Sequence, residues 1–105
     1  PFRIKDIIDN YLKVFKELFM HATGIRRGGS ACLDLAYTAE GIFGGFFECS
    51  LSPWDMAAGA LLVEEADGVV TDFKGSDLYL KTGNIIAGAK RVHQEMLNII
   101  QKTFK

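Results

Sequence analysis

Residues 52–59 read SPWDMAAG, and they include the most informative stretch of the chain, SPWD at residues 52–55. Ser52 suits the N-cap of a helix, and Pro53 suits the first helical position, where a missing backbone N–H has no cost. Asp55 stands three residues after the cap, as in a capping box. The small and apolar residues that follow predict a helix that continues to residue 66 and lies close against a sheet.

Extended segments are predicted on both sides of this helix. Residues 42–49 are β-branched and aromatic and contain two adjacent glycines, which is typical of a strand that another element approaches closely. After the helix, residues 68–73 and 84–88 have the composition of strands, and residues 74–77 have that of a turn. The chain is therefore expected to contribute all three segments to a sheet.

Helices are predicted over three further segments. Apolar residues recur at three- and four-residue spacing over residues 4–19 and again from residue 90 to residue 104, as on one face of an amphipathic helix. Ser30 can cap another helix over residues 31–39, which is apolar on nearly every side and is expected to be buried. The order α, α, β, α, β, β, α predicts a layered α/β or α+β fold, a mixed sheet flanked by helices, in a single domain over residues 1–105.

Composition excludes several broad classes of protein. The 105 residues are 49% hydrophobic and 24% charged, so the chain can bury a core and is not disordered. Its net charge of −1 lacks the positive excess of a dedicated nucleic-acid binder, and no apolar run approaches the roughly 20 residues that cross a bilayer. No apolar secretion-signal core is found near the N-terminus, so the cytosol is the expected compartment. Cys32 and Cys49 lie in apolar surroundings and are expected to be free thiols.

Asp55 has two interpretations. Helix capping alone explains it, because the helix dipole stabilises an acidic side chain in the first turn by about 0.3 to 1 kcal/mol. Beside Trp54 at the mouth of an apolar helix, the same carboxylate could instead bind a hard cation. Glu48 ends the preceding strand seven residues earlier, so both carboxylates can face one cleft and serve Mg²⁺ or a substrate hydroxyl. A solvated Glu at the strand end is the simpler alternative for Glu48.

The glycine pair before Ser30 is a weaker signal. It can present backbone N–H groups to an anion or a hydroxyl at the start of the following helix, with Arg26 and Arg27 nearby as positive charge. The two arginines are equally consistent with a solvated pair or with a subunit contact.

The histidines carry no metal-binding pattern. His21 lies at a helix end and His93 in a helix expected to be exposed, and neither has a second ligand at metal-binding spacing. Both are interpreted as structural. The sequence also contains no Gly-x-Ser-x-Gly elbow, Walker loop or dinucleotide fingerprint.

Four motifs together carry a resemblance to a known family. They are RRGGSACLDLAY at residues 26–37, GGFFE at 44–48, PWDMAAG at 53–59 and GVVTD at 68–72. In this order and register the chain resembles the C-terminal half of an inositol monophosphatase family protein. The resemblance implies the corresponding half of the layered αβαβα fold of these sugar phosphatases.

The resemblance also implies roles for individual residues. Asp55 matches the aspartate that binds a catalytic Mg²⁺ ion at the start of this helix, and Glu48 matches the glutamate that hydrogen-bonds substrate hydroxyls. Gly29, Ser30 and Ala31 match the loop that touches the sugar. The family's remaining metal ligands, an upstream glutamate and an Asp-Pro-x-Asp-Gly-Thr loop that also holds phosphate, have no counterpart in these 105 residues.

The function implied by the resemblance is Mg²⁺-dependent, lithium-sensitive hydrolysis of a phosphomonoester, which converts an inositol phosphate to inositol and phosphate. The chain would supply one side of the active site, would be a poor catalyst alone and would need the N-terminal half of the same enzyme. A cytoplasmic homodimer is expected at full length. Fructose-1,6-bisphosphate and 3′-phosphoadenosine 5′-phosphate are alternative substrates, and a non-catalytic binding or assembly module is the alternative from another class. Apolar surface is expected where the absent half would pack.

Overall fold

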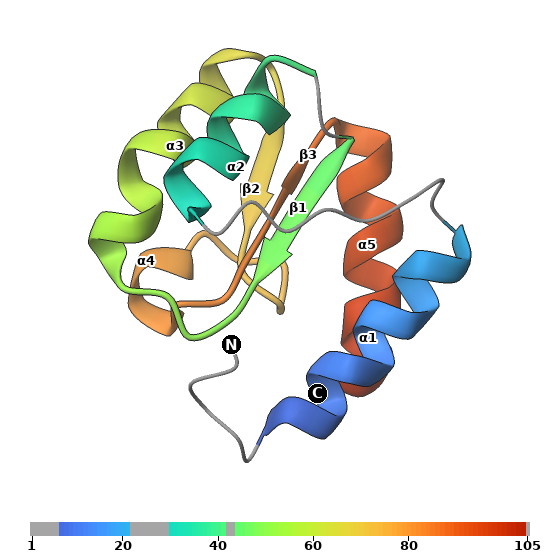
Figure 1. Cartoon of the computed structure of the whole chain (residues 1–105). Helices are drawn as coiled ribbons and strands as arrows, with labels where there is room; N and C mark the ends of the chain where they lie inside the picture. The colour runs from blue at the N-terminus through green and yellow to red at the C-terminus, as the bar shows by residue number, and fades with distance from the viewer. Residues whose placement is uncertain (1–6, 22–29, 42–43, 105) are drawn as a thin grey trace.

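The computed structural model describes residues 7–21, 30–41 and 44–104, which form five helices and three strands (Figure 1). In chain order these elements are α1 (Ile8–His21), α2 (Ala31–Ala39), β1 (Gly45–Glu48), α3 (Pro53–Glu65), β2 (Val69–Thr71), α4 (Tyr79–Thr82), β3 (Ile85–Gly88) and α5 (Lys90–Thr103). All the predicted helices and strands are present within these ranges. The four-residue helix α4 is an addition that the sequence patterns did not predict.

Local signals set the helix boundaries. Ser30 is the N-cap of α2, since its hydroxyl oxygen accepts the Leu33 N–H at 3.4 Å, and α2 spans the predicted residues. α3 begins at Pro53 as expected and ends at Glu65, close to the predicted end. In the described part of the chain α1 begins at Ile8 and continues to His21, two residues past its predicted end.

The three strands form an antiparallel sheet in the order β1-β3-β2. β3 pairs with both neighbours, with Glu48 opposite Ile85 on one side and Val70 opposite Ala87 on the other. β1 and β2 are therefore parallel to each other, with β3 inserted between them. The layered class is confirmed, but both strand pairs in the described residues are antiparallel, so the expected mixed sheet is not seen there. The cause is the connection from β2 to β3, which reverses the chain instead of crossing over the sheet.

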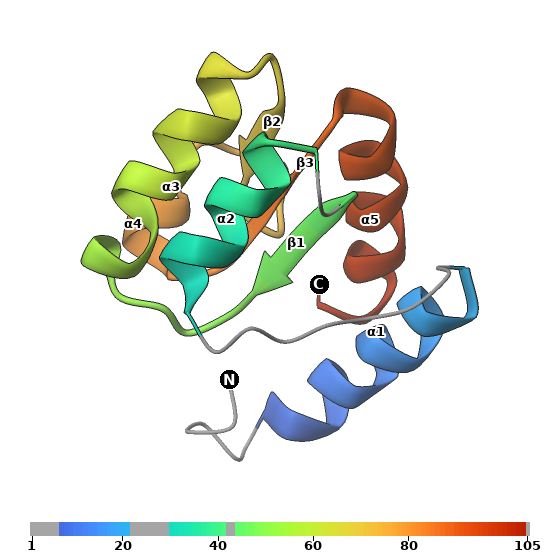
Figure 2. The same cartoon turned by 45° about the horizontal axis from the view of Figure 1, so that its top comes forward.

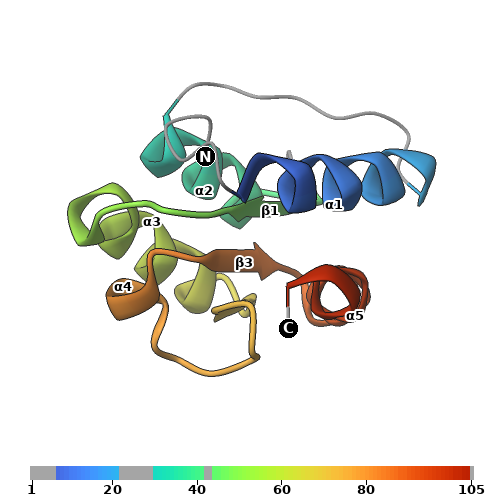
Figure 3. The same cartoon turned by 90° about the horizontal axis from the view of Figure 1, so that it is seen from below.

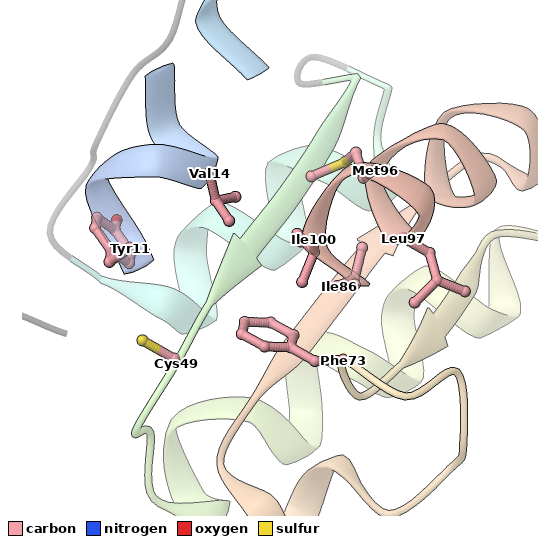
Figure 4. Close-up of a cluster of buried hydrophobic side chains, with 8 residues drawn as sticks. All are labelled: Tyr11, Val14, Cys49, Phe73, Ile86, Met96, Leu97 and Ile100. Atoms are coloured by element: carbon pink, nitrogen blue, oxygen red, sulfur yellow. The ribbon is translucent and has the colours of Figure 1, made fainter. Parts of the chain in front are cut away.

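Helices cover both faces of the sheet, with α1 and α5 on one face and α2 and α3 on the other (Figures 1 and 3). The core under α1 and α5 comprises Tyr11, Val14, Cys49, Phe73, Ile86, Met96, Leu97 and Ile100 (Figure 4). The core under α2 and α3 comprises Leu35, Met56, Ala60, Val63, Val70, Ile85 and Ala87. Consecutive residues of the buried strand β3 thus enter opposite cores, as the two-residue period of a strand requires.

Cys49 is a buried free thiol, as predicted. It belongs to the core under α1 and α5. The side chain of Cys32 lies outside the described part of the structure.

Apolar side chains remain exposed on the helix layer formed by α2 and α3. Trp54 is 81% exposed, and Leu33 and Leu61 are each more than half exposed. The expected apolar surface is therefore present. None of the described helices combines the length and the apolar character that crossing a bilayer demands.

Candidate functional site

Two helix N-termini and the end of a strand lie at the same end of the molecule. α2 and α3 lie side by side and run in the same direction, and β1 runs toward the end at which both helices begin (Figures 1 and 2). Glu48 is the last residue of β1, and Asp55 is the third residue of α3. Asp55 is in the first turn of α3, near the positive end of that helix dipole, where negative charge is stabilised, and Glu48 ends the strand that runs toward the same end of the molecule.

Asp55 forms the predicted capping box. Its Oδ2 accepts the Ser52 N–H at 2.9 Å, which ties the carboxylate to the N-cap of α3. The side chain is half-buried. Capping engages only part of the carboxylate, which offers about four lone-pair positions, so the same residue can also bind a cation.

Glu48 is buried, with 8% of its surface exposed, so the solvated alternative for this residue is wrong. Its position in the sheet explains the burial: it pairs with Ile85, whose side chain belongs to the core under α2 and α3. Glu48 therefore faces the helix layer that also carries Asp55. Burial raises the pKa of the neighbouring Cys49 thiol, and the charge of Glu48 raises it further.

The predicted sugar-contacting loop is described only in part. Ser30 lies at the α2 N-cap with extended backbone, and Ala31 is the first residue of the helix. The first backbone N–H groups of a helix have no partner within the helix, so this terminus can bind a hydroxyl or an anion. Gly29 lies outside the described residues, as do Arg26 and Arg27.

His93 is buried, with 4% of its surface exposed, so its expected position in an exposed helix is wrong. It lies on the sheet-facing side of α5, where its Nε2 is 2.7 Å from Thr71 Oγ1. The same Thr71 hydroxyl also donates to the Asp72 carbonyl at 2.9 Å, which links α5 to the end of β2. Burial lowers the pKa of His93. These contacts are consistent with the structural interpretation of His93. His21 ends α1, and its side chain is outside the described residues.

The described residues offer hard oxygen donors, but they do not form a complete metal site. Mg²⁺ prefers oxygen ligands in near-octahedral geometry and retains several waters. Asp55 fits that chemistry. Within residues 7–21, 30–41 and 44–104, no group of three or more His, Cys, Asp and Glu side chains is arranged to hold an ion. Other ligands would therefore have to come from outside these ranges.

Asn84 and Gly83 contact the segment between Glu48 and Asp55, and no sequence motif predicted this role for either residue. Asn84 Oδ1 accepts the N–H of Ser50, and the Gly83 carbonyl accepts that of Leu51. Both accepting residues precede β3, and both donors lie between Glu48 and Asp55. The Gly-Asn pair is recognisable in the sequence as a turn signal, but its contact with residues about 33 positions earlier is not.

A family model matches nearly the whole chain. The model describes the inositol monophosphatase family and matches residues 2–104. A relative from Pseudomonas aeruginosa, named Nus factor SuhB, is 52% identical over 103 residues, which cover 96% of this chain and 38% of the relative.

Solved structures agree with this match. The extragenic suppressor protein SuhB from Bartonella henselae has a TM-score of 0.87 and 42% identity, over 90% of this chain and 36% of that one. An inositol monophosphatase from Anabaena has a TM-score of 0.80 and 39% identity, over 85% of this chain and 37% of that one. The chain thus spans less than two fifths of the length of these relatives. It belongs to the inositol monophosphatase family.

Proposed function

We propose that this chain supplies the C-terminal part of the active site of a Mg²⁺-dependent phosphomonoesterase that hydrolyses an inositol phosphate. The observation that carries the proposal is the placement of Glu48, Asp55 and the α2 N-terminus at one end of the same helix layer. Family membership supports the reaction class.

Asp55 is the proposed metal ligand and the catalytic residue of this chain. Bound Mg²⁺ would polarise the phosphate and neutralise the charge that develops on the leaving oxygen. Asp55 is suited to hold the ion because the Ser52 N–H orients its carboxylate in advance. The start of a 13-residue helix supplies a rigid support for that side chain.

Glu48, Gly29, Ser30 and Ala31 are the proposed substrate-binding residues. A carboxylate in a buried position accepts strong, charge-assisted hydrogen bonds from hydroxyls, which suits Glu48 to recognition of a polyol ring. The Ser30 hydroxyl already caps α2, so in this proposal the start of the helix contributes mainly backbone N–H groups to the ligand.

The remaining parts of the site are proposed to come from an N-terminal half of the same enzyme. The Pseudomonas relative is more than twice as long as this chain, which leaves room for the missing carboxylates and the phosphate-binding loop. We propose that this half packs against the exposed apolar side chains of α2 and α3. Inhibition by lithium, a homodimeric state and a cytoplasmic location belong to the same proposal, as do fructose-1,6-bisphosphate and 3′-phosphoadenosine 5′-phosphate as alternative substrates.

Phosphate release from inositol monophosphate by the full-length protein tests this function. Activity should need Mg²⁺ and should fall strongly in Asp55→Asn, whereas Glu65→Gln, which alters an exposed carboxylate near the end of the same helix, should match the wild type. A full-length protein without Mg²⁺-dependent phosphatase activity on inositol phosphate or on either alternative substrate would refute the proposal.

A second candidate function is that of a binding or assembly module. The observation in its favour is that a relative with 52% identity is named a Nus factor. The Asp55→Asn variant distinguishes the two functions. A binding module would keep its partner interactions when the carboxylate is neutralised, and its role would not depend on phosphatase activity.

A further inference from the structure

The segment between Glu48 and Asp55 is held by residues that are distant in the sequence. Ser50 N–H donates to Asn84 Oδ1 at 3.3 Å, and Leu51 N–H donates to the carbonyl oxygen of Gly83 at 2.9 Å. The chain that links the two carboxylates is therefore attached to the start of β3.

These two hydrogen bonds depart from the register of the sheet. Within the sheet Glu48 is opposite Ile85, and continuing that register would place Ser50 opposite Gly83. The hydrogen bond to Gly83 comes instead from Leu51, so the β1 side contains one extra residue, as at a β-bulge. Ser50 has a φ of +61°, a left-handed conformation that is unfavourable for a non-glycine residue and that surrounding contacts must hold.

The acceptor side of this contact is itself closely fixed. Gly83 ends α4 with a φ of +76°, and a Cβ on it would lie 2.5 Å from the carbonyl oxygen of Leu51. Only glycine fits both the conformation and the space. Asn84 N–H donates to Thr82 Oγ1 at 3.2 Å, so the backbone that carries the Asn84 side chain is tied to α4 as well.

The contact leads directly to Asp55, the proposed metal ligand. Ser52, the residue after Leu51, donates its N–H to Asp55 Oδ2 at 2.9 Å. A displacement of Ser50 and Leu51 would therefore move the group that orients the Asp55 carboxylate, and it would also release the chain that follows Glu48.

We propose that Asn84 is a positioning residue for the two carboxylates: by holding Ser50 in its left-handed conformation, it sets the place of Asp55 relative to Glu48. The roles of these carboxylates rest on the proposed function. The attachment itself is independent of catalysis and can be measured separately.

Amide hydrogen exchange and carboxyl ¹³C shifts in the full-length protein test the attachment. In Asn84→Ala the Ser50 and Leu51 amides should exchange about tenfold faster, and the Glu48 and Asp55 carboxyl resonances should move. Asn84→Asp keeps an acceptor oxygen and should restore protection of both amides. Ser76→Ala is the control, because it removes a hydrogen bond to Asp72 away from this segment. Unchanged exchange and unchanged carboxyl shifts in Asn84→Ala would overturn the proposal.

Kinetics then test whether the position matters for the reaction. Asn84→Ala should lower kcat/KM for inositol phosphate roughly ten- to a hundredfold and raise the Mg²⁺ concentration at half-maximal activity, and Ser76→Ala should change neither. An active enzyme whose kcat/KM and Mg²⁺ midpoint are unaffected by Asn84→Ala would overturn the positioning role. A wild type with no phosphatase activity would instead refute the proposed function, and the exchange and ¹³C results would still decide the attachment.

Discussion

Gly59 of α3 and Leu35 of α2 approach so closely that a Cβ on residue 59 would lie 2.5 Å from Leu35 Cβ. This contact lets the two helices lie side by side with their N-termini at one end of the layer (Figure 2). Ser30 begins one helix and Asp55 lies in the first turn of the other, so the packing at Gly59 contributes to the spacing between these two parts of the candidate site.

Gly59→Ala should therefore lower the free energy of unfolding. The added methyl group gains up to about 1 kcal/mol in helix propensity, but forcing apart two packed helices typically costs about 1–3 kcal/mol, and Leu35 has little freedom to move because it is fully buried. Urea unfolding followed by circular dichroism measures the difference. Gly44→Ala is the control, because a Cβ there meets no atom within 4 Å. An unchanged unfolding midpoint in Gly59→Ala would show that the layer adapts to the extra volume.

Asp55→Asn should reduce Mg²⁺-dependent activity of the full-length protein far more than its stability. An amide oxygen can still accept the Ser52 N–H, so the capping bond survives, whereas a metal ion loses an anionic ligand. Phosphate release over a Mg²⁺ titration and the thermal midpoint should be measured on the same samples. Wild-type turnover at limiting Mg²⁺ would leave Asp55 with the capping role alone.

Glu48→Gln should impair recognition of the substrate and leave the metal requirement unchanged. Losing a charged hydrogen bond to a substrate hydroxyl costs about 1.5 to 3 kcal/mol, or roughly ten- to a hundredfold in kcat/KM. The loss should appear with inositol phosphate and not with a small phosphomonoester that lacks the ring hydroxyls. Equal losses on both substrates, together with a shifted Mg²⁺ midpoint, would assign Glu48 to the metal site instead.

Stability should fall as the pH drops below about 6.5, because burial lowers the pKa of His93 in the folded state. His93 therefore binds a proton more readily in the unfolded chain than in the folded chain. The contribution of His93 to the free energy of unfolding is complete above its pKa in the unfolded chain, and it is lost as the pH falls toward its lower pKa in the folded chain. Comparing unfolding free energies at about pH 7.5 and about pH 5.5 in wild type and His93→Gln measures this effect. Gln can still form a hydrogen bond with Thr71 but does not titrate, so the pH dependence of this variant should be weaker.

Asp72 provides an internal reference for the same titration. Burial alone would raise its pKa, but hydrogen bonds from the Ser76 hydroxyl and from the Ser76 and Lys74 amides lower it overall. Its contribution is present above its ordinary value of 3.8 and is lost at more acidic pH, in a window separate from that of His93. An identical pH dependence in wild type and His93→Gln above about pH 5 would contradict the assignment to His93.

Much of the secondary structure follows from short stretches of sequence. Ser30 and the SPWD stretch specify the starts of α2 and α3, because capping involves groups within three or four residues of one another. The amphipathic period likewise predicts α1 and α5. The four-residue helix α4 was missed because it is shorter than any window in which a helical period can be recognised.

The sequence by itself determined the four longer helices, the strands and the candidate carboxylates, and through its motifs the family. Only the tertiary structure decided which strand lies in the middle of the sheet, which side of it Glu48 faces, and how deeply Glu48 and His93 are buried. It also decided that the Asn84 side chain accepts the Ser50 N–H. The physical reason is range: caps and periodicity act between near neighbours in the chain, whereas strand pairing and burial join residues tens of positions apart and depend on the packing of all the elements together.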